Sequence, residues 1–209
     1  MTSSFHGAFA IVAAALPCLS AAGGLTGEFN FTKKPPSVAL VYFMEDNSLK
    51  GSGPTVDQKD KQFVEKIMVG SSGNKIKFMN SDSVDHNIYA NDSKTGANFD
   101  AGLVSPGQTS QAKVTWKRDE VVKIGCKIHP KMQAYIANIS SAYFKVVEFD
   151  AKKTGESFSL SGAPDKLTKV RVWFPKQDPI EVDIKKGESK QVDILEKGKP
   201  SGSLKLVRK

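Results

Sequence analysis

The stretch Gly125-Cys126-Lys127-Ile128-His129-Pro130-Lys131-Met132 places a thiol, an imidazole and a thioether within seven residues. The spacing is Cys-x2-His-x2-Met, and on a short loop between two strands all three side chains can face one point. A thiolate, an imidazole and a weak thioether belong to the ligand set of a blue-copper centre, which needs a second histidine. Such a site therefore requires a histidine from elsewhere in the chain.

The N-terminal segment changes the count of available ligands. Residues Ala8–Leu19 form an uncharged apolar run that is too short to span a bilayer, and the small residues Ser20-Ala21-Ala22 follow it. This pattern predicts a signal peptide over residues 1–22, cleaved after Ala22, and a periplasmic or otherwise exported protein. A lipid anchor on Cys18 and a buried N-terminal helix are the alternatives, and the stretch before Ala8 lacks the usual Lys or Arg.

Removing the leader leaves few candidate ligands. The whole chain has 2 Cys and 3 His, and the part after Ala22 keeps only Cys126, His86 and His129. A single cysteine excludes an internal disulfide, and these numbers exclude a multi-cysteine zinc scaffold. His86 follows the apolar run that ends at Met79, so the two histidines, Cys126 and Met132 together complete a three-plus-one copper ligand set.

The sequence after the leader predicts an all-β fold. Short apolar runs recur about every ten residues, and Gly, Pro, Asn and Asp separate them. The expected strands are Val38–Met44, Phe63–Val69, Lys75–Met79, Ala112–Trp116, Val121–Cys126, Met132–Ile139, Tyr143–Phe149, Lys169–Phe174, Ile180–Ile184 and Gln191–Leu195. Only Asp57–Ile67 fits a helix about as well as a strand, and the whole pattern favours a sandwich or barrel.

A boundary is expected near Ser140-Ser141. We expect one β-sandwich over residues 23–141 and a smaller β domain over 142–209. The second part contains no Cys, His or Met, so it offers no soft metal ligands. Its last residues, Lys197–Lys209, are basic and contain Gly and Ser, and they are expected to fray.

These motifs resemble those of the cupredoxins, in particular plastocyanin and amicyanin. In that family a Val-x-Phe-x-Asn-x-Asp strand leads to His-Asn-Val-x-Phe. The corresponding residues of this chain, in the same order, are Val69, Gly73, Ile76, Phe78, Asn80, Asp82 and His86-Asn87-Ile88. The short Cys-to-Met loop is most similar to that of amicyanin, and the match covers about Phe63–Ile139.

The resemblance implies a Greek-key cupredoxin sandwich and a role for each site residue. His86, Cys126 and His129 would be the equatorial ligands of one type 1 copper ion, and Met132 the axial ligand. Asn87 would connect the two ligand loops around the metal. The whole layout also resembles bacterial cupredoxin-like proteins often labelled methylamine-utilisation proteins, whose tail is similar to a transthyretin- or carboxypeptidase-regulatory-like module.

These features predict an exported blue-copper protein that carries single electrons and is not an enzyme, because a four-ligand site leaves no open position for substrate. A copper storage or delivery module, a zinc site and a purely structural sandwich pair remain alternatives. The net charge of +8 and the isoelectric point near 9.3 favour acidic redox partners, such as a cytochrome or a dehydrogenase. Lys123, Lys127 and Lys131 lie closest to the copper loop. Neither nucleic-acid binding nor stable membrane insertion of the cleaved chain is expected.

Overall fold

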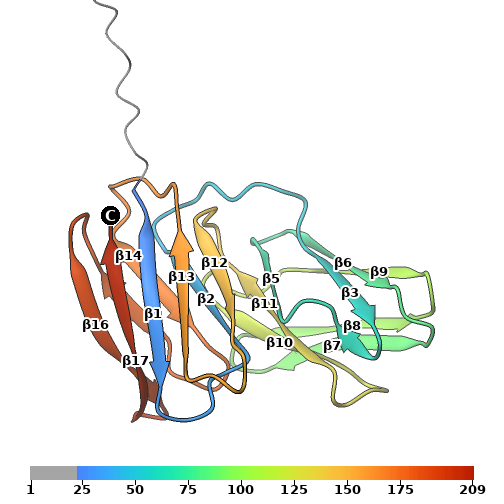
Figure 1. Ribbon diagram of the computed structural model, residues 1–209. Helices are drawn as coiled ribbons and strands as arrows, with labels where there is room; N and C mark the ends of the chain where they lie inside the picture. The colour runs from blue at the N-terminus through green and yellow to red at the C-terminus, as the bar shows by residue number, and fades with distance from the viewer. Residues whose placement is uncertain (1–22) are drawn as a thin grey trace, which may run out of the picture.

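The computed structural model describes residues 23–209, and within them every regular element is a β-strand. The strands form four sheets, which are called A to D below. Sheets D and C form a first sandwich and sheets A and B a second, and the two lie side by side (Figure 1). The predicted leader, residues 1–22, lies outside the described residues.

The first sandwich is built from the middle of the chain. Sheet D has the strand order β5-β11-β10-β7-β8 and sheet C the order β4-β3-β6-β9. Their bounds are β3 Thr55–Lys59, β4 Gln62–Phe63, β5 Ile67–Gly70, β6 Lys75–Asn80, β7 His86–Asp92, β8 Ala97–Val104, β9 Thr109–Lys113, β10 Val121–Cys126 and β11 Gln133–Asn138.

The second sandwich uses both ends of the described chain. Sheet A has the order β13-β1-β17-β16 and sheet B the order β12-β2-β14-β15. Their bounds are β1 Leu25–Phe31, β2 Val38–Phe43, β12 Phe144–Glu148, β13 Gly155–Leu160, β14 Lys169–Trp173, β15 Ile180–Asp183, β16 Ser189–Glu196 and β17 Lys199–Arg208.

The pairing of β1 and β2 corrects the expectation that residues 23–141 form one unit. Strand β1 lies between β13 and β17, and β2 lies between β12 and β14, so both strands belong to the second sandwich. The chain then crosses to the first sandwich in the long connection between β2 and β3 (Figure 1). Sequence order did not reveal this, because strand pairing over more than a hundred residues leaves no local pattern.

Strand β2 explains how the two sandwiches join. All six of its residues, Val38–Phe43, are buried. Ala39, Val41 and Phe43 face the core between sheets A and B. Their alternates, Val38, Leu40 and Tyr42, pack in a third core with residues of sheet D such as Ile67 and Ala137. The sheets therefore stack in the order A, B, D, C, and sheet B is covered on both faces.

An aromatic pair lies at this junction. The rings of Tyr135 on β11 and Trp173 on β14 are 4.9 Å apart and meet edge to face. Edge-to-face contacts of this kind add to the area that the rings bury. Burial at the junction also raises the pKa of the Tyr135 phenol.

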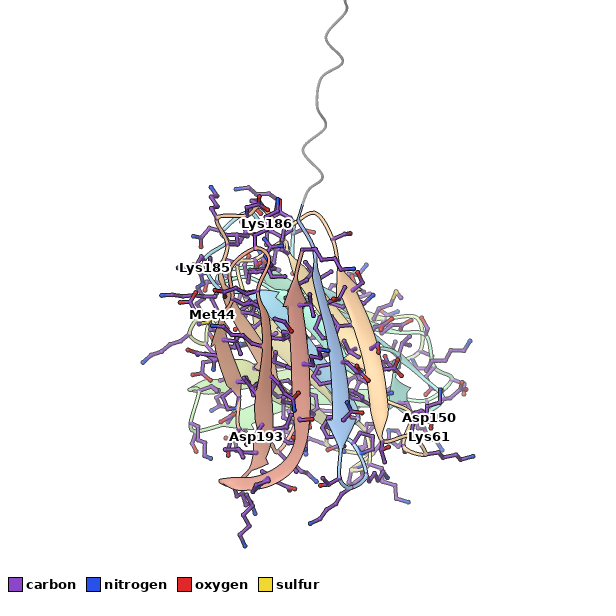
Figure 2. All side chains as sticks on the ribbon, turned by 60° about the vertical axis from the view of Figure 1, so that its left-hand side comes forward. Met44, Lys61, Asp150, Lys185, Lys186 and Asp193 are labelled. Atoms are coloured by element: carbon purple, nitrogen blue, oxygen red, sulfur yellow. The ribbon has the colours of Figure 1, made fainter. Side chains whose placement is uncertain are left out.

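The C-terminal segment does not fray, contrary to expectation. Strand β17 is ten residues long and pairs with both β1 and β16 in the middle of sheet A (Figure 2). Leu204 and Leu206 are fully buried in the second core, and Arg208 is 1% exposed with its guanidinium on the Phe43 ring. The alternation of these residues is a strand signal that the basic composition of the segment obscured.

The ambiguous segment Asp57–Ile67 is extended rather than helical. It contains the end of β3, all of β4 and the first residue of β5. A turn at Asp60 and Lys61, which both have positive φ, joins β3 to β4. The single strand expected over Phe63–Val69 is consequently divided in two. Strand β5 then runs parallel to β11 and carries one edge of sheet D.

Candidate metal centre

Two neighbouring strands bring the predicted ligands together. Cys126 is the last residue of β10 and His86 the first residue of β7, and the two strands pair with Cys126 opposite Ile88. The loop after Cys126 carries His129 back toward the same end of the sandwich. Alternation along β10 points Cys126 into the core with Val122 and Ile124.

The three donor atoms form a compact triangle. The Sγ of Cys126 lies 3.7 Å from the Nδ1 of His86 and 3.7 Å from the Nδ1 of His129. The two Nδ1 atoms are 3.2 Å apart. The centre of such a triangle lies about 2 Å from each corner, which matches bonds from a transition metal to imidazole nitrogen and thiolate sulfur. This cluster fits one metal ion bound by two nitrogens and a sulfur.

A carboxylate orients His86. The Oδ2 of Asp82 lies 3.1 Å from the Nε2 of His86, whose side chain is fully buried. A carboxylate there accepts the Nε2 proton, so the Nδ1 lone pair faces the other two donors. The main-chain N–H of Lys61 donates to the same carboxylate, and this bond holds the pKa of Asp82 below its ordinary value.

The loop between β6 and β7 is itself held by a buried amide. The Nδ2 of Asn80 donates to the carbonyl oxygens of Val84 and Val104, and its Oδ1 accepts the N–H of Asp82. Asn80 is fully buried, so these bonds are shielded from water. Asn80 thereby fixes Asp82, which in turn contacts His86.

Asn87 connects the two ligand loops through its main chain. Its N–H points at the Sγ of Cys126 at 3.4 Å, and its carbonyl accepts the N–H of Lys127 at 2.9 Å. The side-chain Oδ1 of Asn87 is buried and has no hydrogen-bond partner among residues 23–209.

Met132 closes the loop next to the cluster. Its N–H donates to the carbonyl oxygen of His129 at 2.9 Å, so the four residues from His129 to Met132 form a turn. Its side chain is 3% exposed and lies in the same core as Cys126. The position agrees with a ligand at this end of the sandwich, and ligation by the thioether stays a prediction.

The outer side of the cluster is apolar with charges around it. His129 is only partly buried, and Ile128 beside it is 49% exposed. Leu103 on β8, which pairs with Asn87 on β7, is 62% exposed. The Nζ of Lys127 forms an ion pair with Asp100 at 2.6 Å. This bond is also the main cause that lowers the pKa of Asp100.

The structure brings together His86, Cys126 and His129 as the sequence predicted. Sequence reasoning did not assign the roles of Asp82 and Asn80, although both stand in the matched motif. The position of Asp82, four residues before His86 and next to a turn, was the available signal.

No protein-family model and no curated protein matches the chain. Among solved structures, a purple cupredoxin from Nitrosopumilus maritimus is 21% identical with a TM-score of 0.32, over 37% of this chain and 81% of that chain. A reduced Cu(I) form of an amicyanin point mutant is 14% identical with a TM-score of 0.38, over 53% of this chain and 97% of that one.

A copper-containing nitrite reductase from Thermus scotoductus SA-01 is also similar. It is 20% identical with a TM-score of 0.37, and the match spans 44% of this chain but 23% of that chain. All three TM-scores lie below 0.4. Within residues 23–209 no helix is long and apolar enough to cross a membrane.

Proposed function

We propose that this protein is a blue-copper protein that carries single electrons between redox partners. The observation that supports the proposal most directly is the triangle of Cys126 Sγ, His86 Nδ1 and His129 Nδ1, with sides of 3.2 to 3.7 Å. A thiolate with two imidazoles is a donor set that suits copper, and Met132 is the proposed fourth, weak ligand. A bound copper ion would supply a one-electron change between Cu(I) and Cu(II).

Strand pairing and hydrogen bonds hold the proposed ligands in position without a metal ion. Strand pairing of β7 and β10 fixes His86 and Cys126, while Asp82 fixes the ring of His86. Because these positions are set by buried strands and hydrogen bonds, a change of metal charge would require little movement of the ligands. A small rearrangement of the ligands favours rapid electron exchange. We therefore propose electron transfer and no enzymatic reaction.

The partly exposed edge of His129 is the proposed point of electron exit. The exposed side chain of Ile128, next to His129 in the sequence, adds an apolar surface that a partner protein can approach closely. Lys131 is exposed and has no ion pair among residues 23–209, so it adds free positive charge at the rim. We therefore propose an acidic redox partner, attracted at a rate that falls with added salt.

Export and subgroup are parts of the same proposal. The leader pattern over residues 1–22 supports a periplasmic or otherwise exported protein. The proposed place among methylamine-utilisation-type cupredoxin proteins rests on the sequence resemblance alone. Mass spectrometry of the protein purified from the exported fraction tests the first point. An N-terminus at Gly23 is expected, and a retained Met1 would contradict export by cleavage.

Addition of Cu(II) to the purified protein, followed by visible spectroscopy, tests the copper site. One equivalent should produce an intense charge-transfer band, which Cys126→Ala should abolish because the thiolate is lost. Ser141→Ala is a control that replaces another buried residue, outside the cluster. Tight Cu(I) binding without colour would favour copper storage or delivery, and failure to bind copper would contradict both functions.

A further inference from the structure

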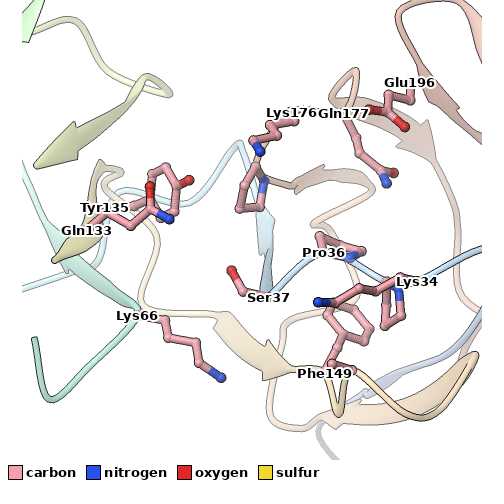
Figure 3. A pocket seen from close by; sticks show the side chains of 13 residues that line it. Lys34, Pro36, Ser37, Lys66, Gln133, Tyr135, Phe149, Lys176, Gln177 and Glu196 are labelled. Carbon is pink, nitrogen blue, oxygen red and sulfur yellow. The ribbon is translucent and has the colours of Figure 1, made fainter. Parts of the chain in front are cut away.

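A cavity of about 530 Å³ lies where the two sandwiches meet, and the proposed copper function does not account for it. Lys66, Gln133 and Tyr135 line it from the first sandwich. Lys34, Phe149 and Lys176 are among the residues that line it from the second (Figure 3). Cavities of this size at the junction of two units are typical of small-molecule sites.

The charge of the residues that line the cavity is predominantly positive. Three lysines line it and only one acidic residue, Glu196, does so. Lys66 has a carboxylate partner, Glu148 at 2.6 Å, whereas Lys34 and Lys176 form no ion pair within residues 23–209. Figure 3 shows the ammonium groups of Lys34 and Lys66 extending from opposite sides into the open space around Ser37.

Backbone geometry contributes to the placement of Lys176. This residue has a φ of 66°, a left-handed conformation that is uncommon for residues other than glycine. It follows Pro175, which also lines the cavity. The turn thus places a long cationic side chain beside a rigid apolar wall.

The other residues that line the cavity favour a carboxylate ligand over a phosphate ligand. Phe149 and three prolines provide apolar surface, and Gln133 and Gln177 provide amides. No arginine lines the cavity, and no glycine-rich loop or helix start does, although these are the usual binders of a phosphate group. Separate ammonium groups around an apolar wall suit several carboxylates joined by a carbon skeleton.

We propose that this cavity is a binding site for a small organic polycarboxylate that contacts both sandwiches. Lys34 and Lys176 would bind separate carboxylates, and the Phe149 side would contact the carbon skeleton. This site is independent of the metal centre, so it stands even if the chain binds no copper.

The test is binding of tricarballylate to the full-length purified protein, measured by calorimetry and by the change in Tm. We choose this tricarboxylate because it lacks the hydroxyl with which citrate chelates metals. The expected result is saturable binding at one site with a higher Tm, since a ligand that binds only the folded state stabilises it. No measurable binding would overturn the proposal.

Lys34→Gln/Lys176→Gln should weaken binding at least tenfold. The control Lys77→Gln/Lys113→Gln removes the same charge from exposed positions on sheet C, and it should change the affinity less than twofold. Gln133→Glu, which leaves every lysine in place but adds a negative charge, should also weaken binding. An equal loss of affinity in both double variants would show that the ligand is attracted only by the net charge of the protein. This result would overturn the proposed binding site.

Two further probes identify the class of ligand. Inorganic phosphate should bind at least tenfold more weakly than tricarballylate, and a tetraglutamate peptide should bind no more tightly. Equal binding of phosphate would overturn the polycarboxylate class. Tighter binding of the peptide would overturn the small-molecule assignment in favour of an acidic protein segment.

Discussion

The environment of His86 depends on one carboxylate, Asp82. It lies 3.1 Å from the histidine Nε2 and accepts main-chain N–H bonds from Lys61 and Ser83. A carboxylate behind a ligating imidazole makes the ring a stronger donor and fixes its orientation. The strength of metal binding at this site should therefore respond to a residue that is not itself a ligand.

Asp82→Ala should weaken copper binding about ten- to hundredfold, the range seen when the partner of a ligating histidine is removed. Asp82→Asn should retain orientation in part and raise the reduction potential, because a neutral group stabilises Cu(II) less than a carboxylate does. Competition with a copper chelator and a redox titration measure the two quantities.

Asp85→Asn is the matched control, because Asp85 is an exposed acid of the same loop. It removes the same charge without a contact to His86. An equal effect of both substitutions would show that only net charge matters and would contradict the role of Asp82.

At the residue scale, the Cys-x2-His-x2-Met spacing predicted that Cys126 and His129 lie together, and the count of histidines after the leader added His86. The spacing succeeds because a short loop restricts where two of the three side chains can be, and because the chain after the leader offers no other histidine. The role of Asp82 was not predicted, since it depends on the turn that Asn80 holds in place. A hydrogen-bonded turn of this kind has no period that sequence reasoning can detect.

At Gly202, strand β17 lies so close to the backbone of β1 that only glycine fits. A Cβ added at Gly202 would lie 2.4 Å from the carbonyl oxygen of Asn30 on β1 and 3.0 Å from the Cα of Phe31. Both neighbours are backbone atoms of a paired strand, so neither can move without loss of pairing.

Gly202→Ala should lower the free energy of unfolding by about 2 kcal/mol, a typical effect of forcing atoms into a packed region. Ser203→Ala, one position further along the same strand, should have little effect. Urea unfolding measures both, and hydrogen exchange should show faster opening of β1 in the glycine variant. A fully stable Gly202→Ala protein would contradict the close approach of β1 and β17.

Most strands of both sandwiches were predicted, and the reason is alternation. In β10 and β14 every second residue is apolar and buried, so the pattern and the structure agree. Strands β1, β7, β8, β13 and β17 were not predicted. In β8, five of the eight residues are Ala, Asn, Asp or Gly, so the strand has no regular apolar alternation. Strand β2 was predicted as a strand but assigned to the wrong sandwich, since burial on both faces does not reveal the partners.

The whole molecule is a stack of four sheets, and the contact between sheets B and D holds its two halves together. Tyr135 and Trp173 pack edge to face there, 4.9 Å apart. Two of the proposed ligands, Cys126 and Met132, belong to the separate core between sheets D and C. Stability of the junction and properties of the metal site should therefore be separable.

Trp173→Ala should destabilise the protein by about 2 kcal/mol, less than for a fully buried tryptophan because Trp173 is only partly buried. Trp173→Phe, which keeps an aromatic ring, should have a smaller effect. Chemical unfolding gives these values, and the visible spectrum of the copper-loaded variant should stay as in the wild type. A changed spectrum would contradict the independence of the two cores.

The lysines around the metal centre should affect how the whole molecule docks to a charged partner. Lys127 is neutralised by Asp100, whereas Lys131 forms no ion pair within residues 23–209. Lys131→Gln should therefore slow electron exchange with an acidic partner more than Lys127→Gln does, and the difference should shrink as ionic strength rises. Stopped-flow kinetics at low and high salt measure this. Equal rates for both variants at low salt would contradict docking at this rim.

The pairing of β1 and β2 with strands from the other end of the chain has a consequence for synthesis of the protein. These strands emerge first from the ribosome, yet β17, which pairs with β1, is made last. Leu25, Phe29 and the apolar run Val38–Phe43 must therefore remain without any sheet partner until β12 and β13 have been made, and β1 lacks its second partner until β17 follows. Nascent chains stalled before β12 should therefore contain a folded metal-site sandwich together with an unpaired, apolar N-terminal segment that binds chaperones.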